Sequence, residues 1–350
     1  MDKEWESSDC QDALAELNLE LQQHPHHIDA YHARSALFYT LGDYEAGIKD
    51  LDAIVQRDAR SVLAYALRGY GHGQLNNYSQ AIVDYERAIE LCPNYPKAYF
   101  NRGTIYDRLE QYERAVSDYN QALKLDPNYV DAYYNRGIVR NRLGQYEQAI
   151  ADYTQVIDLQ PDDEAAYYNR GNTYNRLQQY SKAIADYNRA IALNPTDLEA
   201  YYNRANVYYK TELYPEAIAD YTQVSESNPY HAPTYYNRGT TYLAAQNLPQ
   251  AIADFSQAIE LNPEYTEAYY NRAVAYNKSR EYQLAIADHQ QAIGLNPSYA
   301  EAYGNLGLVY QTIGERRLAI ENLQQAAKLF QQQNNLSLYN YVREKLSEIG

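Results

Sequence analysis

The sequence has few of the residues that mark disulfide-bonded, metal-binding or membrane-spanning proteins. Its 350 residues include only 2 Cys, 1 Met and 1 Trp. Cys10 and Cys92 form no CxxC pair and no disulfide framework. No apolar run approaches the length of about 18 residues that a membrane span needs, and the acidic start MDKEWESSDC lacks the apolar core of a signal peptide. We therefore expect a cytoplasmic protein with no direct membrane insertion.

Basic residues are outnumbered by acidic ones. The chain has 30 Lys and Arg against 46 Asp and Glu, a net charge of −16 and a pI near 4.9. Such a charge repels the phosphate backbone of nucleic acids and anionic membrane surfaces. Neither nucleic acid nor lipid is therefore an expected partner.

Tyrosine is unusually abundant, with 42 Tyr against 4 Phe. A tyrosine buries its ring while its hydroxyl reaches water or a polar partner. Thin layers of paired helices need such side chains, because few of their positions are fully enclosed.

Prolines recur at intervals of 34 residues, or of twice 34 where Ala59 interrupts the series; they are Pro25, Pro93, Pro127, Pro161, Pro195, Pro229, Pro263 and Pro297. A period in the range of about 20 to 50 residues indicates a solenoid, and this one is typical of one helix-turn-helix per repeat. We expect an all-α solenoid of such helix pairs. An array adds repeats along one axis, so the length need not imply several domains.

Alignment on the prolines predicts three parts of the chain. Residues 1–27 are an N-terminal half repeat or cap. Residues 334–350 are a C-terminal capping helix, because Leu338, Val342, Leu346 and Ile349 lie at helical spacing. Between them stand nine tandem repeats: 28–61, 62–95, 96–129, 130–163, 164–197, 198–231, 232–265, 266–299 and 300–333.

The repeats carry a motif that is similar to that of a known family. The repeat 164–197 carries, in order, Tyr167, Gly171, Tyr174, Ala183, Tyr187 and Pro195. This pattern resembles that of tetratricopeptide repeat proteins, and the chain resembles a long array of the YYNRG type. Arginine at the seventh position, where the family commonly has leucine, is a systematic departure. The resemblance implies an all-α, right-handed superhelical α-solenoid. Of function it implies protein binding and little more, because the family's functions are varied.

An arginine and an aspartate separated by 16 residues recur in eight repeats. In the ninth repeat both change together, to Leu306 and Asn322. This joint loss favours an ion pair within each repeat over a pair between repeats. The predicted pairs are Arg34–Asp50, Arg68–Asp84, Arg102–Asp118, Arg136–Asp152, Arg170–Asp186, Arg204–Asp220, Arg238–Asp254 and Arg272–Asp288.

The residue before each arginine is the main candidate for binding. Ala33 and Leu67 stand there in the first two repeats, and the rest have asparagine: Asn101, Asn135, Asn169, Asn203, Asn237, Asn271 and Asn305. Asparagine has weak helix propensity, and its amide has the donor and acceptor that an extended peptide backbone needs. A similar ladder holds substrate backbone in the repeat domain of O-linked N-acetylglucosamine transferase. The alternative is that each amide bonds a neighbouring helix.

Two further rows of residues flank these asparagines in the predicted binding groove. One row is aromatic: Phe100, Tyr134, Tyr168, Tyr202, Tyr236 and Tyr270, which either form pockets for apolar side chains or pack between successive repeats. The other is basic: Arg108, Arg142, Arg176, Lys210 and Lys278, which either attract a ligand with carboxylates or complement the helix dipole.

No catalytic motif is present. The sequence has no GxSxG, P-loop or GxGxxG motif, and its clustered histidines His24, His26, His27 and His32 lack metal-ligand spacing. We expect no enzyme activity, no cofactor and no metal.

These observations predict an adaptor or scaffold that binds an extended or disordered protein segment in its groove. Two alternatives remain. One is a structural protein that associates with itself as a homo-oligomer. The other is a non-catalytic assembly factor for a larger complex, such as a membrane-bound photosynthetic or respiratory one.

Overall fold

The computed structural model describes residues 7–349, and these residues form twenty α-helices. The first helices of the nine repeats are α2 (Ile28–Thr40), α4 (Val62–Gln74), α6 (Pro96–Arg108), α8 (Val130–Arg142), α10 (Glu164–Arg176), α12 (Leu198–Lys210), α14 (Ala232–Ala244), α16 (Thr266–Lys278) and α18 (Ala300–Thr312). The second helices are α3 (Tyr44–Arg57), α5 (Tyr78–Leu91), α7 (Tyr112–Leu125), α9 (Tyr146–Leu159), α11 (Tyr180–Leu193), α13 (Tyr214–Ser227), α15 (Leu248–Leu261), α17 (Tyr282–Leu295) and α19 (Arg316–Gln332). They are flanked by α1 (Ser7–Gln23) and α20 (Leu336–Ile349).

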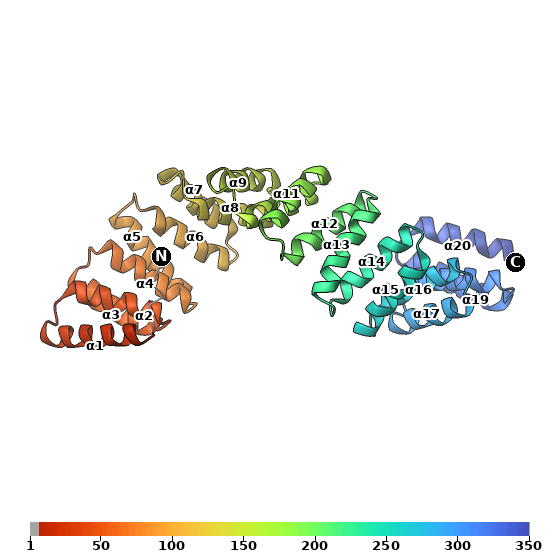
Figure 1. Ribbon diagram of the computed structural model, residues 1–350, viewed down its shortest axis with the longest axis horizontal. Helices are drawn as coiled ribbons and strands as arrows, with labels where there is room; N and C mark the ends of the chain where they lie inside the picture. The colour runs from red at the N-terminus through yellow and green to blue at the C-terminus, as the bar shows by residue number, and fades with distance from the viewer. Residues whose placement is uncertain (1–6, 350) are drawn as a thin grey trace. The chain divides into compact units, whose positions relative to one another are not determined.

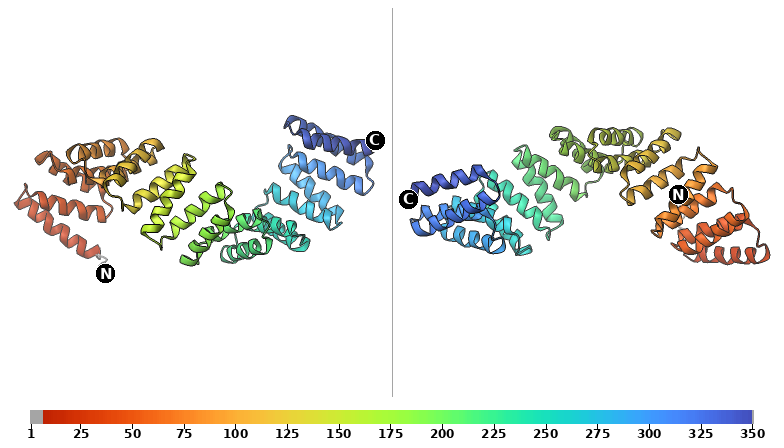
Figure 2. Two further views of the ribbon diagram at one scale, coloured as in Figure 1. Left: turned by 90° about the horizontal axis from the view of Figure 1, so that it is seen from above. Right: turned by 180° about the vertical axis from the view of Figure 1, so that it is seen from behind.

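Helices that follow one another in the chain pack together, as α6 does with α7 and α7 with α8 (Figures 1 and 2). The predicted all-α solenoid of helix pairs is thus confirmed. The chain divides into two compact units, Met1–Thr173 and Tyr174–Gly350, and the division falls within α10.

Every first helix ends in the same turn. After α6, the Glu110 N–H donates to the Asp107 carbonyl at 2.9 Å and the Gln111 N–H to the Tyr106 carbonyl at 2.8 Å. This paired arrangement is the Schellman motif, which needs a positive φ at its central residue. The nine repeats all place a positive φ at their fifteenth residue: Gly42, Asn76, Glu110, Gly144, Gln178, Glu212, Gln246, Arg280 and Gly314.

The second helices end before the periodic prolines. Cys92, which precedes Pro93, has φ −138° and ψ 85°, outside the helical region, because a proline disfavours helix in the residue before it. Asp58 has nearly the same angles, φ −130° and ψ 90°, although Ala59 follows it. The first repeat therefore forms this turn without a proline, whereas α19, with Gln331 at the proline position, continues to Gln332.

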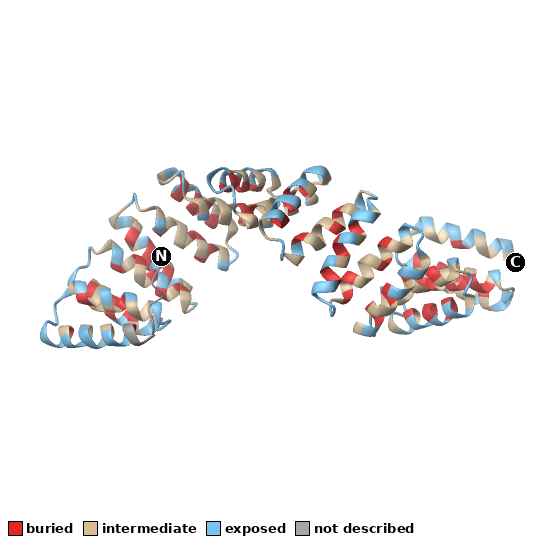
Figure 3. Cartoon of the chain, in the orientation of Figure 1, coloured by how far each residue is buried: buried red, intermediate tan, exposed pale blue. Residues whose placement is uncertain are grey.

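The core lies between the two helices of each repeat, and buried residues follow these facing surfaces (Figure 3). The second helices contribute large rings that are almost fully buried, among them Tyr119 and Tyr153. Tyr119 and Tyr153 each face a glycine of the first helix: a Cβ added at Gly137 would lie 2.8 Å from the Tyr153 ring. Glycine in mid-helix costs about 1 kcal/mol relative to alanine, and here it permits close approach of the paired helix.

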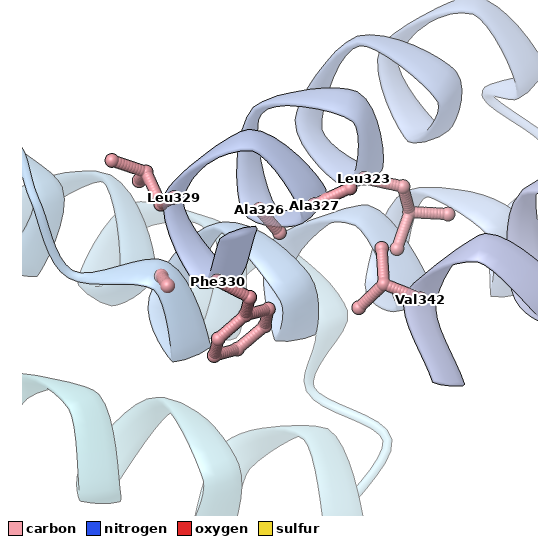
Figure 4. Packing of buried hydrophobic residues seen from close by; sticks show 7 residues of the cluster. Leu323, Ala326, Ala327, Leu329, Phe330 and Val342 are labelled. Carbon is pink, nitrogen blue, oxygen red and sulfur yellow. The ribbon is translucent and has the colours of Figure 1, made fainter. Parts of the chain in front are cut away.

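The last two helices close unit 2 with an apolar cluster. Val342 of α20 packs beside Leu323 and Ala326 of α19, with Phe330 next to them (Figure 4). The amphipathic helix predicted from residues 336 to 349 thus lies against the final repeat.

Candidate functional site

The asparagines at the sixth position of seven repeats form the ladder, one on each first helix from α6 to α18. Within unit 1 these are Asn101, Asn135 and Asn169, and within unit 2 they are Asn203, Asn237, Asn271 and Asn305. All seven are half-buried. Each amide therefore has a side toward the neighbouring helices and a side toward solvent.

The arginines that follow the ladder contact aspartates of the second helix in the same repeat. Arg136 Nη2 lies 2.6 Å from Asp152 Oδ1, and Arg204 Nη2 lies 2.7 Å from Asp220 Oδ1. The aspartates are buried, and most of the pairs are bidentate, which strengthens a charge-assisted hydrogen bond. Further such pairs are Arg34–Asp50, Arg68–Asp84, Arg102–Asp118, Arg238–Asp254 and Arg272–Asp288.

The same arginines also reach the preceding repeat. Arg136 Nη1 donates to Asn120 Oδ1 at 2.5 Å, and Arg204 Nη1 donates to Asn188 Oδ1 at 2.6 Å. Arg170 Nη1 donates to the Thr154 hydroxyl at 2.9 Å. The repeat pattern did not predict these contacts between repeats. Their signal is a polar residue 16 positions before each arginine. Hydrogen bonding to the aspartate raises the pKa of Arg34, so its charge is permanent.

Most ladder amides donate to a tyrosine of the preceding repeat. Asn169 Nδ2 lies 2.9 Å from the Tyr134 hydroxyl. The matching distances are 2.8 Å for Asn237–Tyr202, 3.0 Å for Asn271–Tyr236 and 2.9 Å for Asn305–Tyr270. Within residues 7–349 no group donates to Oδ1 of Asn271 or Asn305. The Nδ2 group of each of these amides thus links two repeats, and the carbonyl oxygen remains an acceptor.

The fifth-position tyrosines pack between successive repeats. The Tyr236 ring stacks on Tyr265 with centroids 4.8 Å apart and lies 6.0 Å from Phe255. Tyr270 lies 4.9 Å from Tyr299 in the same way. Burial raises the pKa of the Tyr134, Tyr202, Tyr236 and Tyr270 hydroxyls. They therefore stay protonated across the physiological range. Tyr168 occupies the same position on α10 and is half-buried.

The basic row is exposed and differs in its partners. Arg142 pairs with Asp107 of the preceding repeat at 2.5 Å, and Lys210 donates to Asn175 at 3.2 Å. Arg108 instead donates to the backbone carbonyl of Gly73 at 3.3 Å. Arg176 and Lys278 are exposed at the ends of their helices.

The tyrosine is absent before two rungs of the ladder. The residue 35 positions before Asn101 is Ala66, and the one before Asn135 is Phe100; neither has a hydroxyl. Across the described part of the chain, the Asn101 side chain forms no hydrogen bond. Asn135 approaches only the Tyr119 hydroxyl. Both asparagines line one hollow of about 210 Å³, whose other residues are Tyr70, Gly73, Gln74, Tyr85, Phe100, Thr104, Ile105 and Arg108. The sequence pattern did not predict this hollow.

Chemistry other than binding has little support in the described residues. No group of three or more His, Cys, Asp or Glu among them could hold a metal ion. Of the clustered histidines, His27 pairs with Glu20 at 2.8 Å through Nδ1. None of the helices described is long and apolar enough to cross a membrane.

Family profiles match the chain almost continuously between residues 72 and 333. A profile described as TPR repeat matches residues 72–110 and 171–212. Profiles described as tetratricopeptide repeat match 103–168, 152–185, 198–231, 236–300 and 300–333. Among curated proteins, none matches this chain.

Solved structures include many similar chains. YrrB, described as a TPR protein with an unusual peptide-binding site, is 27% identical over 53% of this chain and 95% of its own, with a TM-score of 0.49. A tetratricopeptide repeat protein from Parabacteroides merdae is 23% identical over 71% of this chain and 98% of its own, with a TM-score of 0.50. The C-terminal part of a TPR repeat-containing protein from Cytophaga hutchinsonii is 20% identical over 67% and 96%, with a TM-score of 0.60. The last two share the fold.

Proposed function

Because this chain belongs to the tetratricopeptide repeat family, a class that generally mediates protein–protein interactions and is typically non-catalytic, we propose that it is an adaptor or scaffold. It holds an extended peptide segment of a partner protein against the ladder. It acts by binding alone, without a cofactor.

The acceptor oxygens of the ladder are the observation that carries this proposal. Asn271 and Asn305 donate through Nδ2 to Tyr236 and Tyr270, which fixes the orientation of each amide. Their Oδ1 atoms are then held ready to accept an N–H from an extended backbone. A side chain that is already ordered loses less entropy on binding.

The ladder alone gives little affinity. Each hydrogen bond contributes about 0.5 to 1.5 kcal/mol net, while ordering one residue of a flexible segment costs about 1 to 2 kcal/mol. The two terms nearly cancel. Tight binding therefore requires an anchor elsewhere on the same face, or a partner segment that is already extended.

A pair of matched variants tests this function. The first changes Asn237, Asn271 and Asn305 to Ala; the second changes Tyr202, Tyr236 and Tyr270 to Phe. Both remove the same three hydrogen bonds between repeats, so both lower the free energy of unfolding. Only the first removes the ladder oxygens. Partners captured from the source lysate by each full-length variant are quantified by mass spectrometry.

We expect the asparagine variant to lose partners that the tyrosine variant retains. Thermal unfolding of both variants shows that the difference does not come from the loss of folded protein. Capture of the same partners in the same amounts by wild type and both variants would contradict a binding role for the ladder in unit 2.

A further inference from the structure

Repeat 62–95 departs from the pattern of the others on the side that faces α6. Ala66 replaces the usual tyrosine, and Gly73 stands where the next repeat has Asp107. The helix α4 has two glycines beyond the one at the eighth position, and each costs about 1 kcal/mol of helix stability relative to alanine. A Cβ at Gly73 would lie 2.9 Å from Ile105 Cδ1, inside the hollow. The helix α4 is therefore less stable than its counterparts, and the missing side chains leave a hollow beside it.

The Asn135 amide lacks its usual tyrosine of the preceding repeat, without a change in ring packing, and approaches only the Tyr119 hydroxyl. Phe100 lies 4.8 Å from Tyr129 and 5.8 Å from Tyr119. Tyr236, the matching residue in unit 2, lies 4.8 Å from Tyr265 and 6.0 Å from Phe255. The Phe100 ring therefore occupies the usual place and lacks only the hydroxyl that would accept from Asn135.

The charge of Arg108 is not neutralised within the hollow. Its counterpart Arg142 has the Asp107 carboxylate as a partner, because the twelfth residue of the preceding repeat is acidic. For Arg108 that residue is Gly73, which offers only its backbone carbonyl. No carboxylate lines the hollow. One guanidinium and two amides with Nδ2 groups therefore converge on an open space.

The size of the hollow limits what it holds. At about 210 Å³ it is smaller than the roughly 300–1,000 Å³ that enclose drug-sized ligands. It suits one side chain of a longer ligand. Arginine and amide N–H groups together recognise carboxylate oxygens, and Tyr70, 40% exposed, borders the same space.

We propose that this hollow anchors the partner segment by taking one carboxylate side chain, Asp or Glu, of an extended peptide. The inference rests on the proposed function and names its primary contact in unit 1. The residues flanking that carboxylate are uncharged or basic, because a chain with net charge −16 repels a polyacidic segment.

A random-peptide display library selected on the full-length protein supplies the probe. Variants of the hollow are then tested with the selected peptides. Phe100→Tyr restores the hydroxyl and occupies the Asn135 amide. Gly73→Asp gives Arg108 an internal carboxylate, and Gly73→Asn is its uncharged control of equal size. Lys124→Gln, at an exposed position of the second helix α7, is the control outside the hollow and outside the ladder face.

We expect selected peptides to share a single Asp or Glu and to bind Phe100→Tyr and Gly73→Asp about tenfold more weakly, as the loss of a charge-assisted hydrogen bond implies. Phe100→Tyr should keep or raise the midpoint of thermal unfolding, which separates lost binding from lost folding. Gly73→Asn fills the same space without a charge and should weaken binding less than Gly73→Asp does, and Lys124→Gln should bind nearly as wild type does.

Two results would overturn the inference. Peptides without a shared acidic residue contradict the chemistry, and peptides unaffected by Phe100→Tyr and Gly73→Asp contradict the location. If such peptides are instead lost on Asn237, Asn271 and Asn305 to Ala, the ladder still binds and only the hollow is refuted. If neither set of changes matters, the proposed function fails as well.

Discussion

At the residue scale, each buried aspartate depends on one arginine for its charge balance. Asp220 is 6% exposed and accepts from Arg204 Nε and Nη2, both at 2.7 Å. The ninth repeat replaces such a pair with Leu306, which is 3% exposed, and Asn322, which bonds the Leu318 carbonyl. The same site therefore accepts either a complete ion pair or none.

We predict that Arg204→Leu alone lowers the free energy of unfolding by about 3 to 5 kcal/mol, because it leaves a buried carboxylate unpaired. Adding Asp220→Asn reproduces the ninth repeat and should recover most of that loss. Urea unfolding followed by circular dichroism measures both. Equal losses in the single and double variants would show that the Arg204 contacts to Asn188 matter more than the pair.

His289 occupies a position where five other repeats bury a tyrosine. Its ring is fully buried, and neither nitrogen has a hydrogen-bond partner among the described residues. Burial lowers the pKa of His289 from 6.5 to about 4. In the unfolded chain the pKa returns to its ordinary value, so the unfolded state binds the proton first.

Stability should therefore fall as the pH drops from 6.5 to 4, by up to about 3 kcal/mol from this residue. The contribution is complete above pH 6.5 and is lost toward the folded-state pKa. His289→Phe, which copies Phe255, removes this loss. The difference in unfolding free energy between wild type and variant is measured at several pH values. A difference that does not change with pH would mean that His289 is not held neutral by burial.

At the scale of the element, the turn after the second helix of the first repeat forms without a proline. Asp58 keeps the conformation found before proline although Ala59 follows it. The Ala59 N–H forms no hydrogen bond in the described residues, so a proline there removes no donor that is in use. The turn after each first helix likewise does not depend on glycine, since five repeats keep a positive φ at Glu, Gln or Arg.

We predict that Ala59→Pro raises the free energy of unfolding by about 0.4 to 1 kcal/mol, because it restricts the unfolded chain and fits the native turn. Pro93→Ala in the next repeat is the matched reverse change and should lower it by a similar amount. Thermal unfolding of both variants provides the test. Destabilisation by Ala59→Pro would show that this turn differs from the proline-containing ones.

At the scale of the whole molecule, the period of the prolines predicted the helix pairs, and the spacing from Arg204 to Asp220 predicted which residues meet within a repeat. Alignment of the repeats did not show which residues form hydrogen bonds between one repeat and the next: the Asn169–Tyr134 bond spans 35 residues. The hollow was harder to predict, because it depends on side chains that are missing at Ala66, Gly73 and Phe100. The missing hydroxyl of Phe100 is informative only once the hydrogen bond between asparagine and tyrosine in other repeats is known.

Ladder amides bond a tyrosine of the preceding repeat where one is present, and the two rungs without that tyrosine, Asn101 and Asn135, line the hollow that we propose as the anchor site. A crystal structure of the full chain with a segment that it captures tests this most directly. We predict that backbone N–H groups of the segment lie within about 3.2 Å of ladder Oδ1 atoms, with a carboxylate beside Arg108. A segment bound to the second helices, with the hollow empty, would contradict the account.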